Sequence, residues 1–285
     1  MNPPILSGTS HFYALIGHPV AQVRSPIGFN TYLSSKNIDA AMIPFDLLPN
    51  AIIGFFDMLR GWENCLGCCV TIPHKNIAYE LIDEPMPRAQ RIGAINIIKR
   101  EKSGKLIGDM TDGVGFIDAL KLNGFSVTGK KIGLIGGGGA GSAIADAIAE
   151  HHAAQLSLIE IDKLKSDILL SNLQTQNPDL FLENTISRPE EIDILINASP
   201  LGMNKNDPLP IDPYTFRSGI MVADSVTKPN FTPFLKSAKS NSCFIQKGSE
   251  MADAQLQIFL DFLGTPPENS HVSIIVWRPL AVVRL

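Results

Sequence analysis

Glycine is concentrated near the middle of the sequence, where five glycines fall within the six residues from Gly136 to Gly141. The apolar run before them and the Ala- and Ile-rich run after them predict a strand, a tight turn and a helix. Glycines in a G-x-G-x-x-G pattern allow the turn, admit a diphosphate close to the backbone and let the helix pack on the strand. The stretch therefore predicts a dinucleotide site at Gly136, Gly138, Gly139, Ala140 and Gly141, although glycines also end strands for purely structural reasons.

Glu160 ends the next apolar run, about 20 residues beyond the last of these glycines, as a dinucleotide-binding fold requires. The diphosphate itself would lie on the free N–H groups and positive dipole at the start of the helix. Glycine turn and acidic residue together favour dinucleotide binding over a merely structural turn.

Two other polar stretches lie where helices are expected to begin. Ser25 and Pro26 form a helix-start signal with Ser25 at the N-cap, which indicates either a simply capped helix or a site for a carboxylate at the helix N-terminus. Thr71 and Lys75 follow a β-branched strand. From the local sequence alone, Lys75 is either a solvated surface charge or a catalytic group.

Asn96 and Asp112 complete the polar residues of the first half. Asn96 interrupts the apolar face of a strand expected within residues 92–99. Asp112 lies in an acidic, glycine-rich turn that is expected to precede a helix from Phe116, and aspartates in such turns usually stabilise the turn itself.

The remaining elements alternate between strand and helix. Residues 156–160, 192–197, 220–224 and 242–246 are expected strands of a parallel sheet. Because ligands bind at the carboxyl ends of such strands, the loops that carry Ser199 and Ser225 should face a nicotinamide ring. Gly248 follows the last strand, and a helix over 251–262 carries Gln255.

Composition excludes several classes of protein. The 285 residues, with 45% hydrophobic and 18% charged residues, are typical of a globular α/β protein, and a net charge of −4 with no basic stripe argues against nucleic acid as a partner. No apolar run is long enough to span a membrane and the start lacks a signal peptide, so we expect a cytoplasmic location. Cys65, Cys68 and Cys69 have no second ligand pair, which favours buried thiols over a metal site.

Taken together, the motifs resemble those of the shikimate dehydrogenase family, which includes the quinate/shikimate dehydrogenases. The resemblance is colinear over roughly residues 12–264 and rests on these stretches: Gly17-His-Pro-Val, Arg24-Ser25-Pro26, Val70-Thr71-Ile72-Pro73-His74-Lys75, Gly93-Ala-Ile-Asn96, Gly108-Asp-Met-Thr-Asp112-Gly, the glycine turn, Asn197-Ala-Ser-Pro-Leu-Gly-Met203, Thr232-Pro-Phe and Gly248-x-x-Met251-x-x-x-Gln255.

The resemblance implies two α/β domains with the active site between them. Residues 1–114 would form the substrate-binding catalytic domain, which the C-terminal segment 249–285 completes, and residues 115–248 would form a Rossmann dinucleotide-binding domain.

The resemblance also implies roles for single residues. Lys75 and Asp112 would be the catalytic pair of an NAD(P)-dependent alcohol dehydrogenase, while Thr71, Asn96 and Gln255 would bind ring hydroxyls. Ser25, with Thr227 in place of a common tyrosine, would hold the carboxylate of shikimate, quinate or a related alicyclic hydroxy acid.

The sequence departs from the family pattern at the substrate side. Val23 replaces a usual serine, Cys69 an asparagine, and Met110 another asparagine. These changes leave open an alternative function as a dinucleotide-binding regulator or weakly active paralogue, and they leave the exact substrate open. A folate-linked dehydrogenase is disfavoured because it is expected to lack the Asn96, Asp112 and Gln255 set.

Cofactor choice is predicted from the residues that follow the second Rossmann strand. NADP-using relatives typically carry Asn-Arg-Ser/Thr there, whereas this sequence has Glu160-Ile161-Asp162. A carboxylate accepts hydrogen bonds from a free 2′-hydroxyl and repels a 2′-phosphate, so we expect NAD rather than NADP. The expected partner is a small-molecule substrate, bound by a monomer or homodimer.

Overall fold

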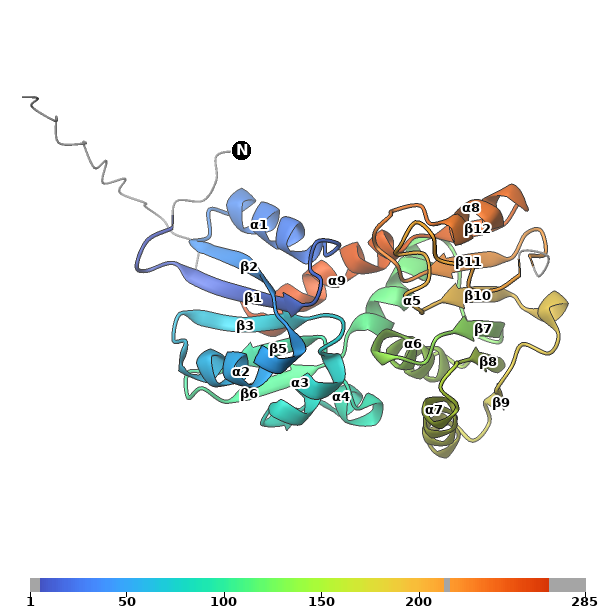
Figure 1. The fold of residues 1–285 in the computed structure, drawn as a ribbon, viewed down its shortest axis with the longest axis horizontal. Helices are drawn as coiled ribbons and strands as arrows, with labels where there is room; N and C mark the ends of the chain where they lie inside the picture. Colours follow the sequence, from blue (N-terminus) through green and yellow to red (C-terminus); the bar gives the residue numbers. More distant parts are fainter. Residues whose placement is uncertain (1–5, 213–215, 267–285) are drawn as a thin grey trace, which may run out of the picture.

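The computed structural model describes residues 6–212 and 216–266. Two six-stranded sheets lie side by side along the long axis of the molecule, each with its own helices (Figure 1). The α/β fold class expected from the sequence is therefore confirmed. None of the described helices combines the length and the apolar character needed to cross a lipid bilayer.

The first sheet has the strand order β2-β1-β3-β5-β6-β4. Its elements are β1 (His11–Gly17), α1 (Ser25–Ser35), β2 (Ala40–Asp46), α2 (Ile52–Gly61), β3 (Cys65–Val70), α3 (Lys75–Leu81), β4 (Glu84–Pro85), α4 (Pro87–Ile92), β5 (Ile97–Arg100) and β6 (Leu106–Asp109). The sheet is mixed, because β5 runs antiparallel to both β3 and β6.

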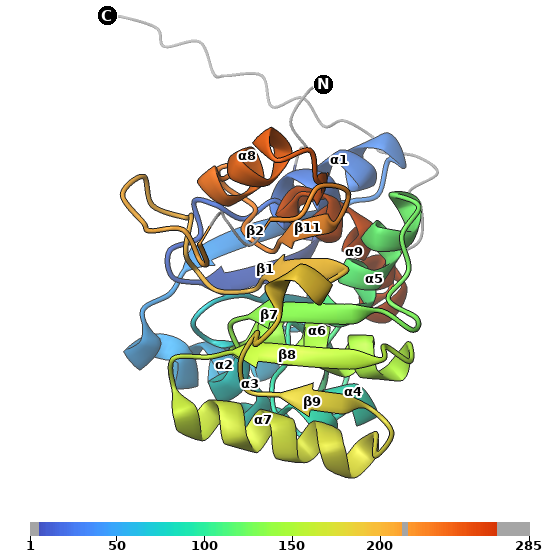
Figure 2. The same cartoon turned by 90° about the vertical axis from the view of Figure 1, so that its right-hand side faces the viewer.

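The second sheet has the strand order β12-β11-β10-β7-β8-β9, and all its pairings are parallel. Its elements are β7 (Lys131–Ile135), α6 (Gly139–Glu150), β8 (Gln155–Ile159), α7 (Lys163–Gln176), β9 (Phe181–Glu183), β10 (Ile194–Asn197), β11 (Met221–Asp224), α8 (Pro233–Ser240) and β12 (Phe244–Gln246). Figure 2 shows β7, β8 and β9 in succession, with α7 beyond them. The strand order reverses between β7 and β10, where the carboxyl ends of a doubly wound sheet leave room for a ligand.

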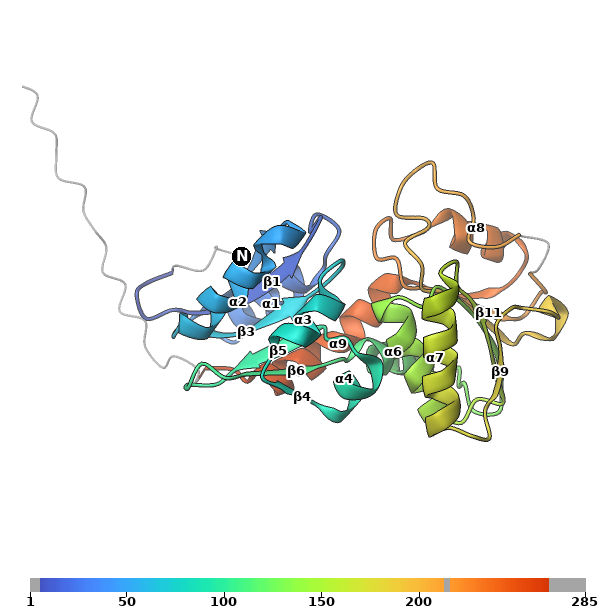
Figure 3. The same ribbon diagram turned by 60° about the horizontal axis from the view of Figure 1, so that its bottom comes forward.

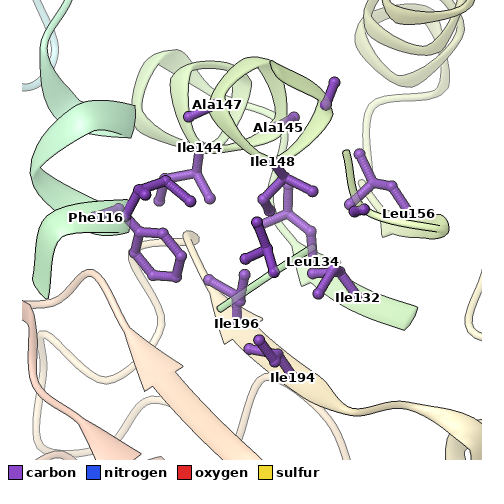
Figure 4. Packing of buried hydrophobic residues seen from close by; sticks show 14 of the residues in the cluster. Phe116, Ile132, Leu134, Ile144, Ala145, Ala147, Ile148, Leu156, Ile194 and Ile196 are labelled. Atoms are coloured by element: carbon purple, nitrogen blue, oxygen red, sulfur yellow. The ribbon is translucent and has the colours of Figure 1, made fainter. Parts of the chain in front are cut away.

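Packing of α6 on the second sheet forms its largest core. The alanines and isoleucines of α6 face apolar residues of β7, β8 and β10, and Ile144, Ile148, Leu134 and Ile196 are fully buried (Figure 4). Small alanines let α6 approach the sheet closely, which fixes the position of the helix N-terminus.

Two helices connect the halves of the molecule. Helix α5 (Asp112–Leu122) leads from the first sheet to the second, and α9 (Gly248–Leu263) returns and packs on α1, α5 and β5. Figure 3, from another direction, again places α9 between the two halves. Together they form the junction at which the two sheets meet.

The structure corrects several local expectations. The strand expected within residues 92–99 is shorter, because α4 ends at Ile92 and β5 begins only at Ile97, so Asn96 precedes the strand rather than interrupting it. The acidic turn at Asp112 is the first turn of α5, which was expected to begin at Phe116. Residues 267–285, part of the segment 249–285 that was expected to complete the first domain, lie outside the described residues.

Candidate active site

A cavity of about 630 Å³ is lined by residues from both halves of the molecule. It brings together all of the predicted site residues except Gly141: Ser25, Thr71, Lys75, Asn96, Asp112, Gly136, Gly138, Gly139, Ala140, Glu160, Ser199, Ser225, Thr227, Gly248 and Gln255. The side chains predicted to meet substrate thus share one space with the glycine turn predicted to meet a cofactor.

Lys75 and Asp112 form an ion pair in this cavity. The two side chains are only 15% and 6% exposed, so water screens their interaction little. Each is the first residue of a helix: Lys75 begins α3 directly after the turn that follows β3, and Asp112 begins α5. The turn before Lys75 is anchored by His74, which is buried and whose Nε2 lies 2.7 Å from the Leu47 carbonyl oxygen.

Asn96 and Gln255 donate hydrogen bonds to Oδ1 of the Asp112 carboxylate, the oxygen that does not face Lys75. Asn96 Nδ2 donates to Asp112 Oδ1 at 2.7 Å, and Gln255 Nε2 donates to the same atom at 3.3 Å. The amide oxygen of Asn96 in turn accepts from the Thr111 backbone N–H at 2.9 Å. Because Oδ1 is occupied in this way, Oδ2 is the oxygen left to face Lys75.

Two glycines allow α5 to bring Asp112 into this position. A Cβ on Gly113 would lie 2.1 Å from the Ala143 carbonyl oxygen of α6, and a Cβ on Gly115 would lie 2.4 Å from Gln255 Cγ of α9. Since real Cβ atoms do not approach other atoms so closely, any larger residue would push the helices apart. The glycines that suggested a turn in the sequence instead permit a three-helix contact beside the ion pair.

The glycine turn after β7 has the geometry expected of a dinucleotide cradle. Gly136 has a φ of +98°, which L-residues with a side chain rarely adopt. A Cβ on Gly141 would lie 2.0 Å from the Gly136 carbonyl oxygen, so Gly141 serves the packing of α6 on the turn and does not line the cavity. The turn and the N-terminus of α6 leave backbone N–H groups available to a diphosphate.

Glu160 follows β8 and is held by backbone donors at both of its oxygens. Gly137 N donates to Oε2 at 2.6 Å, and Asp162 N donates to Oε1 at 2.9 Å. These bonds fix the carboxylate beside the glycine turn, where it also lines the cavity.

Ser25 and Thr227, the two residues predicted to hold a carboxylate, both line the cavity but differ in their hydrogen bonds. Ser25 is the first residue of α1, whose N-cap is Arg24 without a side-chain cap, so the expectation that Ser25 caps the helix was wrong. The Ser25 hydroxyl lines the cavity and bonds to no residue that the structure describes. Thr227 also lines the cavity, but its hydroxyl donates to the Gln22 carbonyl oxygen at 3.2 Å and can offer a ligand only its lone pairs.

The sequence did not identify the apolar part of the cavity wall. Met251 and Phe259 line it together with Gln255. These three residues of α9 are spaced by four and therefore share one face of the helix. That spacing is visible in the sequence and could have revealed the wall once Gln255 had been singled out.

The clustered cysteines are buried thiols. Cys65, Cys68 and Cys69 are at most 3% exposed, and burial raises the pKa of the Cys69 thiol far above its usual value. Protonated thiols are poor metal ligands, and no cluster of three His, Cys, Asp or Glu side chains suited to a metal occurs within residues 6–212 and 216–266.

Comparison with known sequences identifies relatives over nearly the whole chain. Residues 15–98 match the family model of the shikimate dehydrogenase substrate binding domain. A shikimate dehydrogenase (NADP+) of Bacillus cereus is 32% identical over 275 residues, which cover 94% of this chain and 98% of the relative. Another from Sphingopyxis alaskensis is 29% identical over 263 residues, covering 92% and 94%.

Solved structures of shikimate dehydrogenases also align with nearly the whole chain. A shikimate dehydrogenase in complex with NADP+ aligns with a TM-score of 0.83 and 29% identity over 92% of each chain. A shikimate 5-dehydrogenase from Thermus thermophilus, in complex with NADP(H) and shikimate, gives 0.79 and 27%, covering 90% of this chain and 95% of the other. The ligand-free 5-ketofructose reductase of a Gluconobacter species also gives 0.79 and 27%, covering 91% and 95%.

Proposed function

The chain belongs to the shikimate dehydrogenase family of NAD(P)-dependent oxidoreductases, and on that premise we propose that it transfers hydride between NAD and the ring carbon that bears the reacting hydroxyl or ketone of shikimate, quinate or a closely related alicyclic hydroxy acid. The observation that carries the proposal is the buried Lys75–Asp112 pair, which lines the same cavity as the glycine turn.

The residues present fit a dinucleotide. The glycine turn and the start of α6 would hold the diphosphate, Glu160 the adenosine ribose, and the loops with Ser199 and Ser225 the nicotinamide end. When bound, the nicotinamide supplies the hydride acceptor or donor.

Lys75 and Asp112 would manage the proton of the reacting hydroxyl. As an alcohol is oxidised, negative charge develops on its oxygen, and the Lys75 ammonium is placed to donate a hydrogen bond there. Asp112 orients Lys75 through Oδ2 and, with Asn96 and Gln255 held on Oδ1, presents a polar surface to neighbouring hydroxyls. A protein that only binds a dinucleotide has no need of such a pair, which argues against the regulatory alternative.

Preference for NAD is supported by the charges near the adenosine ribose. The fixed Glu160 carboxylate and the nearby Asp162 would repel a 2′-phosphate, and the neighbouring Lys165 is already paired with Asp162 at 3.4 Å. This preference would set the chain apart from the relatives whose names or complexes carry NADP.

Substrate identity depends on the wall opposite the glycine turn. Val23 and Cys69 make part of this wall apolar, and Thr227 donates to Gln22, so of the two hydroxyls predicted to hold a carboxylate only that of Ser25 is free to donate. The proposal therefore includes related alicyclic substrates that need fewer hydrogen bonds at the position of the carboxylate.

The test is a matrix of two cofactors and several substrates, followed by absorbance of the reduced nicotinamide. We expect turnover with shikimate, quinate or an analogue, and kcat/KM at least about tenfold higher with NAD than with NADP. 5-Ketofructose belongs in the panel because a structural relative reduces it. A clear advantage of NADP would contradict the cofactor assignment.

Lys75→Ala provides the matched variant in the same assay. Loss of the group that stabilises the alkoxide should lower kcat by about 10² to 10⁴ while leaving NADH binding intact. If the wild type binds NADH but turns over none of the panel, the regulatory alternative is correct; if Lys75→Ala is fully active, the catalytic assignment is wrong.

A further inference from the structure

A buried carboxylate lies directly behind the loops assigned to the nicotinamide end of the cofactor. Asp224 is the last residue of β11 and is 1% exposed. It pairs in register with Asn197, the last residue of the neighbouring strand β10. Asp224 does not line the cavity, so it cannot itself touch a ligand there.

Three donors converge on the Asp224 carboxylate. Asn197 Nδ2 donates to Oδ1 at 3.0 Å, the Val226 backbone N–H donates to Oδ1 at 2.9 Å, and the Thr232 hydroxyl donates to Oδ2 at 2.6 Å. All three groups are uncharged. Burial without a cation raises the pKa of Asp224 to about 6, which shows that the fold keeps the carboxylate there against a desolvation cost.

Each donor belongs to or holds a different segment of the chain near the cavity. The Asn197 amide oxygen accepts from Ser199 N at 3.1 Å and Ser199 Oγ at 2.6 Å, and its Nδ2 also reaches the Leu201 carbonyl oxygen at 3.0 Å. Val226 belongs to the loop after β11, and Thr232 caps α8 by accepting from Leu235 N at 3.3 Å. One side chain thus ties together two loops and the start of a helix.

Both loops line the cavity on the face that continues from the glycine turn. Ser199, Pro200 and Leu201 come from the first loop, and Ser225, Val226 and Thr227 from the second. Building on the proposed dinucleotide cofactor, we propose that Asp224 is a positioning residue: it holds these two loops in the arrangement that binds the nicotinamide end.

The hydrogen-bond inventory separates the network from its charge. Asparagine at position 224 would keep an oxygen for Asn197 and Val226, and its N–H group could donate to the second lone pair of the Thr232 oxygen, which already accepts from Leu235. Alanine would lose all three contacts and leave the Thr232 hydroxyl, the Val226 N–H and one N–H of Asn197 buried without partners. The two substitutions therefore separate loss of the network from loss of the charge.

The experiment is titration of NADH into purified variants, followed by nicotinamide fluorescence, with KM and kcat measured separately. Asp224→Ala should raise the Kd for NADH at least about tenfold and raise the cofactor KM in parallel, whereas Asp224→Asn should restore both to within about threefold of wild type. Thr232→Val, which keeps Asp224, should have an intermediate effect and covers the case in which Asp224→Ala does not fold.

Asp193→Ala is the matched control. Asp193 lies at the amino ends of β7 and β10, at the opposite end of these strands from Asn197, and accepts a hydrogen bond from Lys131 N at 3.0 Å, so its loss should lower stability without changing NADH binding. The inference is overturned if Asp224→Ala, or Thr232→Val in its place, binds NADH as tightly as the wild type. Failure of the wild type to bind NADH would instead overturn the proposed cofactor.

Discussion

Asp112 and Asp224 are both buried carboxylates, yet their surroundings differ in charge. Asp112 faces the ammonium of Lys75, whereas Asp224 accepts only from uncharged donors. An ammonium offsets the cost of burying a carboxylate, while neutral donors offset it only in part. Ionisation of Asp224 at neutral pH therefore lowers stability relative to its protonated form, a cost that is common for groups retained for function.

The desolvation cost of the ionised Asp224 carboxylate predicts that the stability of the protein depends on pH. Because the pKa of Asp224 is raised from 3.8 to about 6 in the folded protein, its contribution to stability is greatest below about pH 4 and is lost as pH rises through 6. Asp224→Asn removes the titration. The difference in unfolding free energy, variant minus wild type, should rise by about 2 kcal/mol from pH 4.5 to pH 7.

Urea unfolding of both proteins across this range measures the difference. A difference that stays constant with pH would show that Asp224 titrates normally in the folded state.

Helix α5 connects the Lys75–Asp112 ion pair to both neighbouring helices, α6 and α9. Its Gly113 faces α6 and its Gly115 faces α9, so the first turn that begins with Asp112 is clamped from two sides. The position of the carboxylate is thus set by helix packing and not by the turn from which the chain enters α5.

Gly115→Ala tests this packing. The new Cβ would meet Gln255 Cγ and the Met251 carbonyl oxygen, so α9 must shift and Gln255 must leave Asp112. We expect the substrate KM to rise about tenfold and stability to fall by about 1 to 3 kcal/mol. Kinetics and urea unfolding measure the two effects.

Gly54→Ala in α2 is the control, since nothing lies within 4 Å of the Cβ it would add. The same chemical change there should leave KM unaltered and raise stability by up to about 1 kcal/mol. Equal kinetics for Gly115→Ala and wild type would show that α9 tolerates the extra methyl group.

The contrast between α5 and α6 explains what the sequence could predict. The turn at Gly136 and the helix after it depend on local backbone geometry, so their pattern predicted both. Asp112 and the glycines after it were interpreted as a turn. Gly113 and Gly115 are instead required by close contacts with Ala143 and Gln255, which are distant in the sequence. The Asp224 network was missed for the same reason: its partners Asn197 and Thr232 meet only when the strands align.

The two halves of the molecule are also joined by an ion-pair network. Arg91 of α4 donates to both oxygens of Asp146 in α6, at 3.0 and 2.8 Å, and also to Glu150. Asp146 is nearly buried, with 8% of its side chain exposed. This bidentate contact crosses from the first half to the second beside the glycine turn, so we expect it to limit how far the two halves can separate.

Replacing both partners tests that constraint while avoiding an unpaired buried charge. The double variant Arg91→Gln with Asp146→Asn should raise the substrate KM about fivefold, because more of the population has an open cavity that must close before reaction. Small-angle X-ray scattering should show a larger radius of gyration than for the wild type.

The double variant Arg60→Gln with Asp83→Asn is the control, since that pair at 2.9 Å lies within the first half. If both double variants have the same radius of gyration and KM as the wild type, the Arg91 contact does not set the opening of the cavity.

The return of α9 has a consequence for biosynthesis. Tyr13, Phe29 and Leu33 near the N-terminus are buried against Phe259 and Leu260, and the Tyr13 hydroxyl donates to the Gly264 carbonyl oxygen at 2.6 Å. On the ribosome the first half emerges first, but α9, the helix that closes its core, is translated only after the whole second sheet. The nascent chain must therefore keep this apolar surface from aggregating until α9 has been made, and a chain truncated before α9 lacks both that core and one wall of the cavity.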